Sequence, residues 1–263
     1  MSPDELRRMA RRQLADYDAR TPGRLSCRPG ALTIAQAYAL QAEVGLLRER
    51  RGERIIGYKV GCTSKPIQQQ LGVAEPIFGR IFDTGRFRSG ACLSHAGFAN
   101  LAVEGELAVR LGNDLSGPAG SEQACREAIE AVFPVIELHH YVVPAAWPPG
   151  QWLIASGGMH AGFVFEDAGP ACSGPATFPH RLSIRINEVL VGAVDDCETP
   201  LCPIDSLLWL TGRLAQFGLR LWKGQMILTG SPLKLYPVGP GSRIVVEAPP
   251  LGASCVEIAP ARK

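Results

Sequence analysis

Turn-forming residues divide this chain into short segments along its whole length. Glycine occurs 29 times and proline 21 times among 263 residues, which is about a fifth of the chain, against an average usage of roughly 12%. Because proline breaks helices and glycine weakens them, this composition excludes a coiled coil or a long helical bundle. The glycines do not recur at every third position as they do in collagen. The pattern therefore predicts a β-rich or mixed fold made of many short elements.

The charge and hydropathy of the chain exclude several further classes of protein. Hydrophobic residues make up 46% and charged residues 20%, which is too apolar for an intrinsically disordered chain. The 27 basic and 25 acidic residues give a net charge of +2. Near the N-terminus acidic residues interleave with the arginines, which favours a solvated helix face over a nucleic-acid-binding patch. We expect no nucleic-acid partner.

We expect a cytoplasmic protein that does not associate with a membrane. No segment reaches the ~18 consecutive apolar residues of a membrane-spanning helix, and residues 1–20 lack the apolar core of a signal peptide. The eight cysteines include no Cys-x-x-Cys pair, so we expect free thiols in a reducing compartment. A zinc site built on Cys197 and Cys202 is the less favoured alternative, because their spacing is poor for such a site.

Two helices are predicted at the start of the chain. Apolar residues recur at helical spacing within the first 20 residues. Thr33 is a typical N-cap for a second helix that runs to about Arg51 and ends at Gly52. We expect these helices to form an N-terminal helical lobe over residues 1–55, packed on a β-rich catalytic body over residues 56–263 that forms one integrated domain.

After residue 54 the pattern changes to short apolar or alternating segments, which predict strands. The predicted strands cover 54–61, 101–112, 134–143, 158–167, 180–194, 225–230 and 242–248, and the 180–194 segment turns at Asn187 and Glu188. Helices are expected at 121–133 and 203–218, with a short helical turn at 63–72 and a turn-rich stretch from 76 to 94.

Three glutamates interrupt apolar strands and indicate a metal site. Glu104 and Glu106 lie two residues apart in LAVEGELAVRLG, so their side chains share one face of a strand. Glu137 is the one carboxylate in the apolar run PVIELHH. Buried carboxylates are costly without a partner, and a hard divalent cation such as Mg²⁺ or Mn²⁺ is a suitable partner. The alternative is three ordinary glutamates facing outward from half-exposed strands.

Lys59 is a single charge in the apolar segment IIGYKVG. A buried lysine near carboxylates can act as a general acid or hold a substrate carboxylate. The alternative is a lysine that extends along the surface and keeps its charge in water.

With these motifs the sequence resembles the 2-keto-4-pentenoate hydratase / 4-oxalocrotonate decarboxylase family of the fumarylacetoacetate hydrolase superfamily. The resemblance extends over roughly residues 30–250. It is carried by IIGYKVGCTSKPIQQQLGVAEPIFGRIF, VEGELAVRLGNDL, PVIELHH and the C-terminal segment from SLLWLTGRLAQFG to GSRIVVE. No single motif is specific, but the combination is.

The resemblance implies an α+β fold, a mixed β-sandwich roll of the fumarylacetoacetate hydrolase C-terminal-domain type with an N-terminal helical lobe, and a homo-oligomer. It implies Mg²⁺ or Mn²⁺ as the cofactor and Lys59 as an active-site residue. The implied metal ligands are Glu104, Glu106 and Glu137. The implied substrate-side positions are Ile77, Gly230 and Ser231.

The chain departs from the family pattern at substrate-side positions. Ile77 follows Pro76 where such enzymes usually have Asp, and Ser156 and Gly157 stand where they have Asp and Asn. The metal-binding residues are therefore retained while the polar groups around them differ.

Histidines appear near these departures. His139 and His140 lie where an Asp is frequent, and His160 is an additional histidine. Because histidine titrates near neutral pH, all three are candidate bases, and we take Lys59, His139 and His160 as the candidate catalytic residues.

The expected activity is a divalent-metal-dependent hydratase that adds water to a 2-hydroxy-2,4-dienoate and gives a 4-hydroxy-2-oxo acid in aromatic catabolism. The same metal site suits a 4-oxalocrotonate-type decarboxylase or an acylpyruvate C–C hydrolase, since each reaction begins from a small 2-oxo acid that can chelate one cation. A non-catalytic subunit in complex with a pathway partner enzyme is a third alternative. The carboxylate cluster argues against it, because clustered charge without a metal is destabilising.

Overall fold

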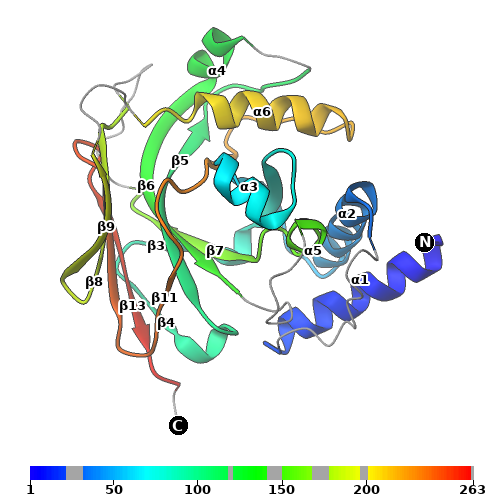
Figure 1. The fold of residues 1–263 in the computed structure, drawn as a ribbon, viewed down its shortest axis with the longest axis horizontal. Coiled ribbons are helices and arrows are strands. Elements are labelled where there is room, and N and C mark those ends of the chain that lie inside the picture. The colour runs from blue at the N-terminus through cyan, green and yellow to red at the C-terminus, as the bar shows by residue number, and fades with distance from the viewer. Residues whose placement is uncertain (22–31, 118–120, 141–149, 168–177, 196–200, 262–263) are drawn as a thin grey trace.

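The structure is a computed structural model that describes residues 1–21, 32–117, 121–140, 150–167, 178–195 and 201–261. Two β-sheets pack face to face, and helices surround the part of the larger sheet that the smaller sheet does not cover (Figure 1). The predicted α+β β-sandwich roll is confirmed. Within the described ranges, no helix combines the length and the apolar character needed to cross a membrane.

The larger sheet is mixed and strongly curled. Its strands in spatial order are β2 (Ile77–Phe82), β1 (Ile55–Gly61), β10 (Met226–Leu228), β5 (Ala102–Leu111), β6 (Ile129–His139), β7 (His160–Phe165) and β3 (Arg86–Arg88), with β11 (Tyr236–Pro237) also paired to β5. The β1–β10 and β3–β7 pairs are parallel, and the other pairs are antiparallel.

The smaller sheet packs against β6 and β7. Its order is β4 (Ala91–Ser94), β13 (Ala253–Ala259), β12 (Arg243–Glu247), β8 (Arg181–Ile186) and β9 (Val189–Asp195). The predicted hairpin turn is confirmed, because Asn187 and Glu188 have φ values of 50° and 66° between β8 and β9, as a two-residue hairpin turn requires.

The helices are α1 (Pro3–Asp18), α2 (Ile34–Arg50), α3 (Lys65–Leu71), α4 (Glu122–Ala128), α5 (Gly150–Ala155) and α6 (Ile204–Ala215), with 3₁₀ turns η1 (Asp83–Gly85) and η2 (His95–Gly97). Thr33 caps α2 as predicted, since its hydroxyl accepts from the Gln36 N–H. The two N-terminal helices, α1 and α2, contact each other. The first strand of the chain follows them and begins at Ile55. The division into a lobe and a catalytic body stays a prediction.

The structure differs from the predicted elements at several places, among them β13, which was not predicted. The helix expected at 121–133 ends at Ala128, and Ile129 begins the buried strand β6, because burial in the sheet outweighs local helical preference. The stretch 76–94 contains strand β2, whose residues are mostly buried. The short helix α5 was not predicted, since its six residues are too few to show a helical period.

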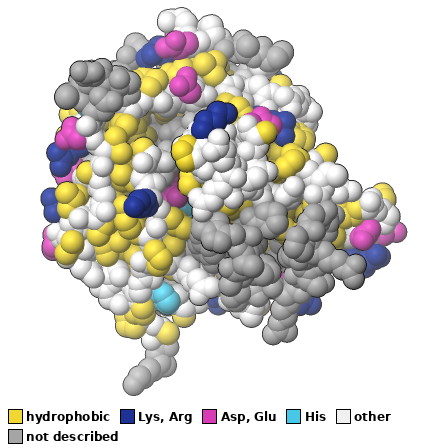
Figure 2. Space-filling view, in the orientation of Figure 1, with side chains coloured by type: hydrophobic (Ala, Val, Ile, Leu, Met, Phe, Trp, Pro, Cys, Tyr) yellow, Lys and Arg dark blue, Asp and Glu magenta, His cyan; other side chains and the backbone are white. Residues whose placement is uncertain are grey.

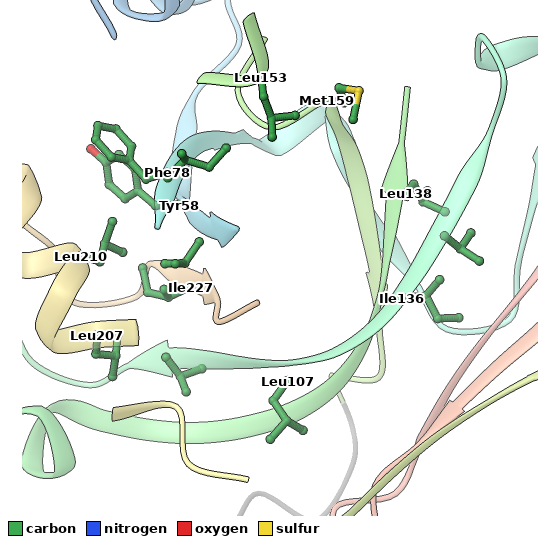
Figure 3. Packing of buried hydrophobic residues seen from close by; sticks show 14 of the residues in the cluster. Tyr58, Phe78, Leu107, Ile136, Leu138, Leu153, Met159, Leu207, Leu210 and Ile227 are labelled. Carbon is green, nitrogen blue, oxygen red and sulfur yellow. The ribbon is translucent and has the colours of Figure 1, made fainter. Parts of the chain in front are cut away.

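The curl of the larger sheet encloses its concave face, because β2 and β7 come into contact. At one end of this face the strands contribute a compact apolar cluster of Ile81, Ala108, Ala131, Phe133, Val135, Phe163, Phe165, Met226 and Leu228. The convex side belongs to the main core, in which Leu207 and Leu210 of α6 lie near Ile227 of β10 (Figure 3). The other end of the concave face carries the charged residues described below.

His140 anchors helix α1 to the larger sheet. Its Nδ1 accepts from the Ala99 N–H at 2.9 Å, so its Nε2–H donates to the Tyr17 carbonyl at 3.0 Å. The imidazole is buried and lies edge-on to the Tyr17 ring at 4.6 Å. Both ring nitrogens are therefore engaged, and the structure gives His140 a structural role in place of the expected role as a base.

We expect His140→Ala to lower the free energy of unfolding by about 2–3 kcal/mol, because it leaves a buried N–H and a carbonyl without partners. Urea denaturation measures the loss, and hydrogen exchange should show it concentrated in α1. The partly exposed His95 provides the control, and His95→Ala should change stability by less than about 0.5 kcal/mol. Equal losses in the two variants would contradict the anchoring role.

Candidate metal centre

Strand pairing brings the predicted glutamates together on the concave face. Glu104 of β5 lies directly opposite Glu137 of β6, and Glu106 follows two residues along β5. His139 follows two residues after Glu137 and pairs with His160 of β7 across a register shift. Residues two apart on a strand share a face, so these five side chains form one cluster.

Lys59 completes the cluster from β1. Its Nζ lies 3.0 Å from Glu137 Oε1 and 3.3 Å from Oε2. Lys59 is only 4% exposed, and Glu106 and Glu137 are 0% and 1% exposed. The ammonium is therefore buried among carboxylates, which excludes the alternative of a surface lysine.

A glycine turn holds Glu106. The N–H of Gly230 donates to Glu106 Oε2 at 2.6 Å, while the buried Oε1 has no hydrogen-bond partner among the described residues. Gly230 has a φ of +93°, and a Cβ there would lie 2.6 Å from Thr63 Cγ2, so a glycine is required. Ser231 supports this turn, since its hydroxyl donates to the Gly105 carbonyl at 2.8 Å.

The two histidines of the cluster differ in their contacts. His160 Nδ1 lies 2.7 Å from Glu137 Oε1, and its buried Nε2 has no partner among the described residues. His139 Nε2 lies 3.3 Å from Glu104 Oε2 and 3.5 Å from Glu137 Oε2, without the angles of a hydrogen bond. Both imidazoles are buried beside carboxylates.

Burial and mutual charge set the electrostatics of the cluster. Burial, followed by the charge of Glu137, raises the pKa of Glu106 well above its usual range. Burial also acts to raise the pKa of Glu137, but the charge of Lys59 outweighs it and holds that pKa well below its usual range. Burial acts to lower the pKa of Lys59, but the three glutamates outweigh it, so the pKa is raised and the side chain is an ammonium.

These residues fit a divalent cation. Ligand atoms of Glu104, Glu137 and His139 lie within 4.8 Å of one another, and Glu106 carries a buried oxygen without a partner. A mainly oxygen donor set suits Mg²⁺ or Mn²⁺. The sequence pointed to the three glutamates, whereas the structure groups His139 with two of them.

A glycine turn that the sequence patterns did not predict covers Lys59. Gly157 and Gly158 follow α5 with φ values of 67° and 71°, and a Cβ at Gly158 would lie 2.4 Å from Lys59 Cε. A Cβ at Gly79 would lie 2.2 Å from the Gly157 carbonyl oxygen. The adjacent glycines in ASGGMH were the signal that this turn packs closely on a neighbour.

Ile77 lies close to Lys59. A Cβ at Gly61 would be 3.6 Å from both Ile77 Cγ1 and Lys59 Nζ. In the space-filling view, a hollow lies between α3 and the chain that leads into β11, and acidic side chains are visible inside it (Figure 2).

The zinc site considered as an alternative from the sequence required Cys197, which lies outside the described residues.

Curated relatives of this chain are hydratases. A 2-hydroxyhexa-2,4-dienoate hydratase of Comamonas testosteroni is 30% identical over 243 residues, which cover 91% of each chain. A 2-oxo-hept-4-ene-1,7-dioate hydratase of Escherichia coli is 28% identical and covers 85% of this chain and 86% of its own. No protein-family model matches the chain.

Solved structures share the fold. A 4-oxalocrotonate decarboxylase from Pseudomonas putida G7, complexed with magnesium and adipate, aligns with a TM-score of 0.90 at 23% identity over 98% of both chains. A fumarylpyruvate hydrolase from Pseudomonas aeruginosa, in complex with Mn²⁺ and pyruvate, has a TM-score of 0.53 at 15% identity, covering 77% of this chain and 88% of its own.

We expect Glu106→Gln to stabilise the metal-free protein and to weaken metal binding. The amide oxygen can still accept from the Gly230 N–H, while a buried charge beside Glu137 is lost, so the free energy of unfolding should rise by about 1–2 kcal/mol. Calorimetric titration with Mg²⁺ and Mn²⁺ should show that the metal affinity falls by roughly tenfold or more. The exposed Glu257→Gln is the control, and unchanged metal affinity in Glu106→Gln would remove Glu106 from the metal centre.

We expect Cys62, just after β1, to resist alkylation at pH 8. Burial raises the pKa of its thiol to about 11, so about one molecule in a thousand carries the reactive thiolate at that pH. Labelling by iodoacetamide, followed by mass spectrometry, should be far slower at Cys62 than at the exposed Cys92 and Cys202, and should rise steadily toward pH 11. Equal rates at pH 8 in the folded protein would contradict this burial.

Proposed function

The chain belongs to the 2-keto-4-pentenoate hydratase / 4-oxalocrotonate decarboxylase family of the fumarylacetoacetate hydrolase superfamily, and we propose that it is a divalent-metal-dependent hydratase. The reaction adds water to a 2-hydroxy-2,4-dienoate and gives a 4-hydroxy-2-oxo acid in aromatic catabolism. Relatives that align over most of the chain carry hydratase names, which supports this reaction. The structural observation that supports it is a buried lysine among three carboxylates on the concave face.

Glu104, Glu106 and Glu137 would hold the cation, which we propose is Mg²⁺ or Mn²⁺, and His139 is close enough to contribute a further ligand. When bound, the cation supplies a Lewis acid for the carboxylate and the 2-oxo group of the substrate. Because the cluster binds a small acid through charge, the near-neutral net charge of the protein does not oppose an anionic substrate.

Lys59 serves as a donor in this proposal. Its raised pKa keeps it an ammonium, so it can donate hydrogen bonds to a substrate carboxylate or a proton to carbon, but it is not a base. The Gly157–Gly158 turn fixes its position from one side and Glu137 from the other.

His160 would orient water in this proposal. Because its Nδ1 faces the Glu137 carboxylate at 2.7 Å, the proton of the neutral ring lies on Nδ1 and Nε2 is an acceptor. An acceptor at this position can hold the water molecule that is added to the substrate. His139, which faces two carboxylates, serves in this proposal as a ligand or as a second base.

The remaining predicted positions would shape the substrate site. Ile77 would offer an apolar surface beside Lys59 to the hydrocarbon part of the substrate. Gly230 and Ser231 would bound the site through their turn, since the Ser231 hydroxyl already bonds the Gly105 carbonyl. We also keep the homo-oligomer and the complex with a pathway partner enzyme as proposals.

We expect Mg²⁺ or Mn²⁺ to support loss of the dienoate absorbance of 2-hydroxypenta-2,4-dienoate, and a chelator to abolish it. Lys59→Met should lower kcat by roughly 100-fold or more, because it removes the donor. The matched control is Lys223→Met, at an exposed lysine. A spectrophotometric assay measures both.

The assay panel includes 4-oxalocrotonate and an acylpyruvate. Turnover of only one of these would replace the hydratase by a decarboxylase or a C–C hydrolase. Chelator-insensitive turnover would contradict the metal dependence, and absence of turnover on the whole panel would favour a non-catalytic subunit.

A further inference from the structure

A second pocket lies beside the metal centre, between α1, α2, β2 and the turn that follows α5. Its interior has about 50 Å³ of space for the centres of water molecules, which is room for a few water molecules or one small polar group. Its polar lining includes Gln13, Gln41, Arg48, Arg80, Ser156 and His160. Two guanidinium groups and no carboxylate line it among the described residues, so its charge is positive.

Arg80 is the unbalanced charge in this pocket. It lies on β2 opposite Tyr58, and therefore on the face turned away from Gly79 and Lys59. Its Nη1 donates to Gln41 Oε1 at 2.8 Å, and no carboxylate of the described residues lies within ion-pair distance. Burial lowers the pKa of Arg80. The charge of the exposed Glu49, which acts on Arg80 without direct contact, raises that pKa but does not outweigh burial.

Arg48, the other guanidinium of the pocket, has a carboxylate partner. Its Nη2 and Nε lie 2.5 Å and 2.9 Å from Glu53 Oε2, and its charge stacks over the Phe82 ring at 3.8 Å. The contrast identifies Arg80 as the group that gains from an external anion, because a partly buried guanidinium without a counter-charge is unfavourable. Gln41 occupies one donor of Arg80, and the other N–H groups of the guanidinium can form a fork for a carboxylate.

His160 is a wall of this pocket and also a member of the metal cluster. Its Nδ1 is engaged by Glu137, and its buried Nε2 has no partner in the described part of the chain. The Nε2 atom lies on the side of the ring away from Glu137. The pocket and the metal centre therefore share this imidazole as a common wall.

We propose that this pocket binds the carboxylate group of a small organic acid, with Arg80 as its cation and His160 as its link to the metal centre. The planar fork of the arginine matches the two oxygens of a carboxylate. The carboxylate comes either from a second acid group of the substrate or from a separate organic acid. This binding site is additional to the proposed hydration reaction, since a carboxylate can bind to Arg80 without any turnover of substrate.

Calorimetric titration of chelator-treated, full-length protein with succinate tests the site without the metal. Saturable binding is expected, with affinity reduced roughly tenfold or more in Arg80→Gln, as for loss of a charge-assisted hydrogen bond. The succinate affinity of Arg80→Lys should lie between those of the wild type and Arg80→Gln, because lysine keeps the positive charge but cannot form two parallel hydrogen bonds to one carboxylate. The exposed Arg54→Gln should bind as the wild type does.

Absence of saturable binding, or equal binding by the wild type and Arg80→Gln, would overturn the proposal. Thermal unfolding of each variant shows that it is folded, and removal of an unpaired buried charge should not lower the melting temperature. If Arg80→Gln fails to fold, Arg80→Lys carries the comparison, and unchanged affinity there overturns the bidentate site.

Steady-state kinetics then distinguish the two sources of the carboxylate, and this arm rests on the proposed function. If the carboxylate belongs to the substrate, Arg80→Gln raises KM for a dicarboxylic 2-hydroxydienoate and leaves KM for 2-hydroxypenta-2,4-dienoate unchanged. If it belongs to a separate acid, succinate changes the KM of the monocarboxylic substrate in the wild type but not in Arg80→Gln. Because calorimetry needs no turnover, failure of the hydratase assay would leave the test of the pocket intact.

Discussion

The burial of two carboxylates and one ammonium, beside a third and partly exposed carboxylate on the same face of the curled sheet, is the constraint on which the rest of the structure depends. Glu104, Glu106 and Glu137 carry three negative charges and Lys59 one positive charge, so the cluster sums to −2 when all four are ionised. One divalent cation balances that sum. Without it, like charges within contact raise the free energy of the folded state. Burial and, after it, the charge of Glu137 raise the pKa of Glu106 accordingly.

The fold supplies the rigidity that such a cluster needs. Side chains on the concave face change from an apolar cluster around Phe133 and Phe163 at one end to the charged residues at the other. The apolar end fixes the spacing of the strands, because interiors pack closely and resist deformation. Glycines at 79 and 158 then allow β2 and the turn after α5 to approach Lys59 within contact distance, so water is displaced from the buried ammonium.

The local part of this site could be predicted from the sequence, and the long-range part could not. Alternation along a strand placed Glu104 and Glu106 on one face, and the isolated charge of Lys59 in an apolar segment indicated its burial. The pairing of His160 with His139 depends on a register shift between β6 and β7, which no pattern within one strand encodes. The α4–β6 boundary at Ile129 and the contact of β2 with β7 depend likewise on partners distant in sequence.

Three of the departures from the family pattern lie together in the structure. Ser156, Gly157 and His160, which stand where the family has other residues or none of this type, line the same pocket as Arg80. The glutamates and Lys59, which follow the pattern, lie on the other side of His160. The two groups of residues meet at that imidazole, whose Nδ1 is fixed by Glu137, and at the Gly157–Gly158 turn that packs on Lys59. Changes on the pocket side can therefore alter which acid is bound while the charges that hold the cation stay in place, because His160 transmits contact without contributing a formal charge of its own when neutral.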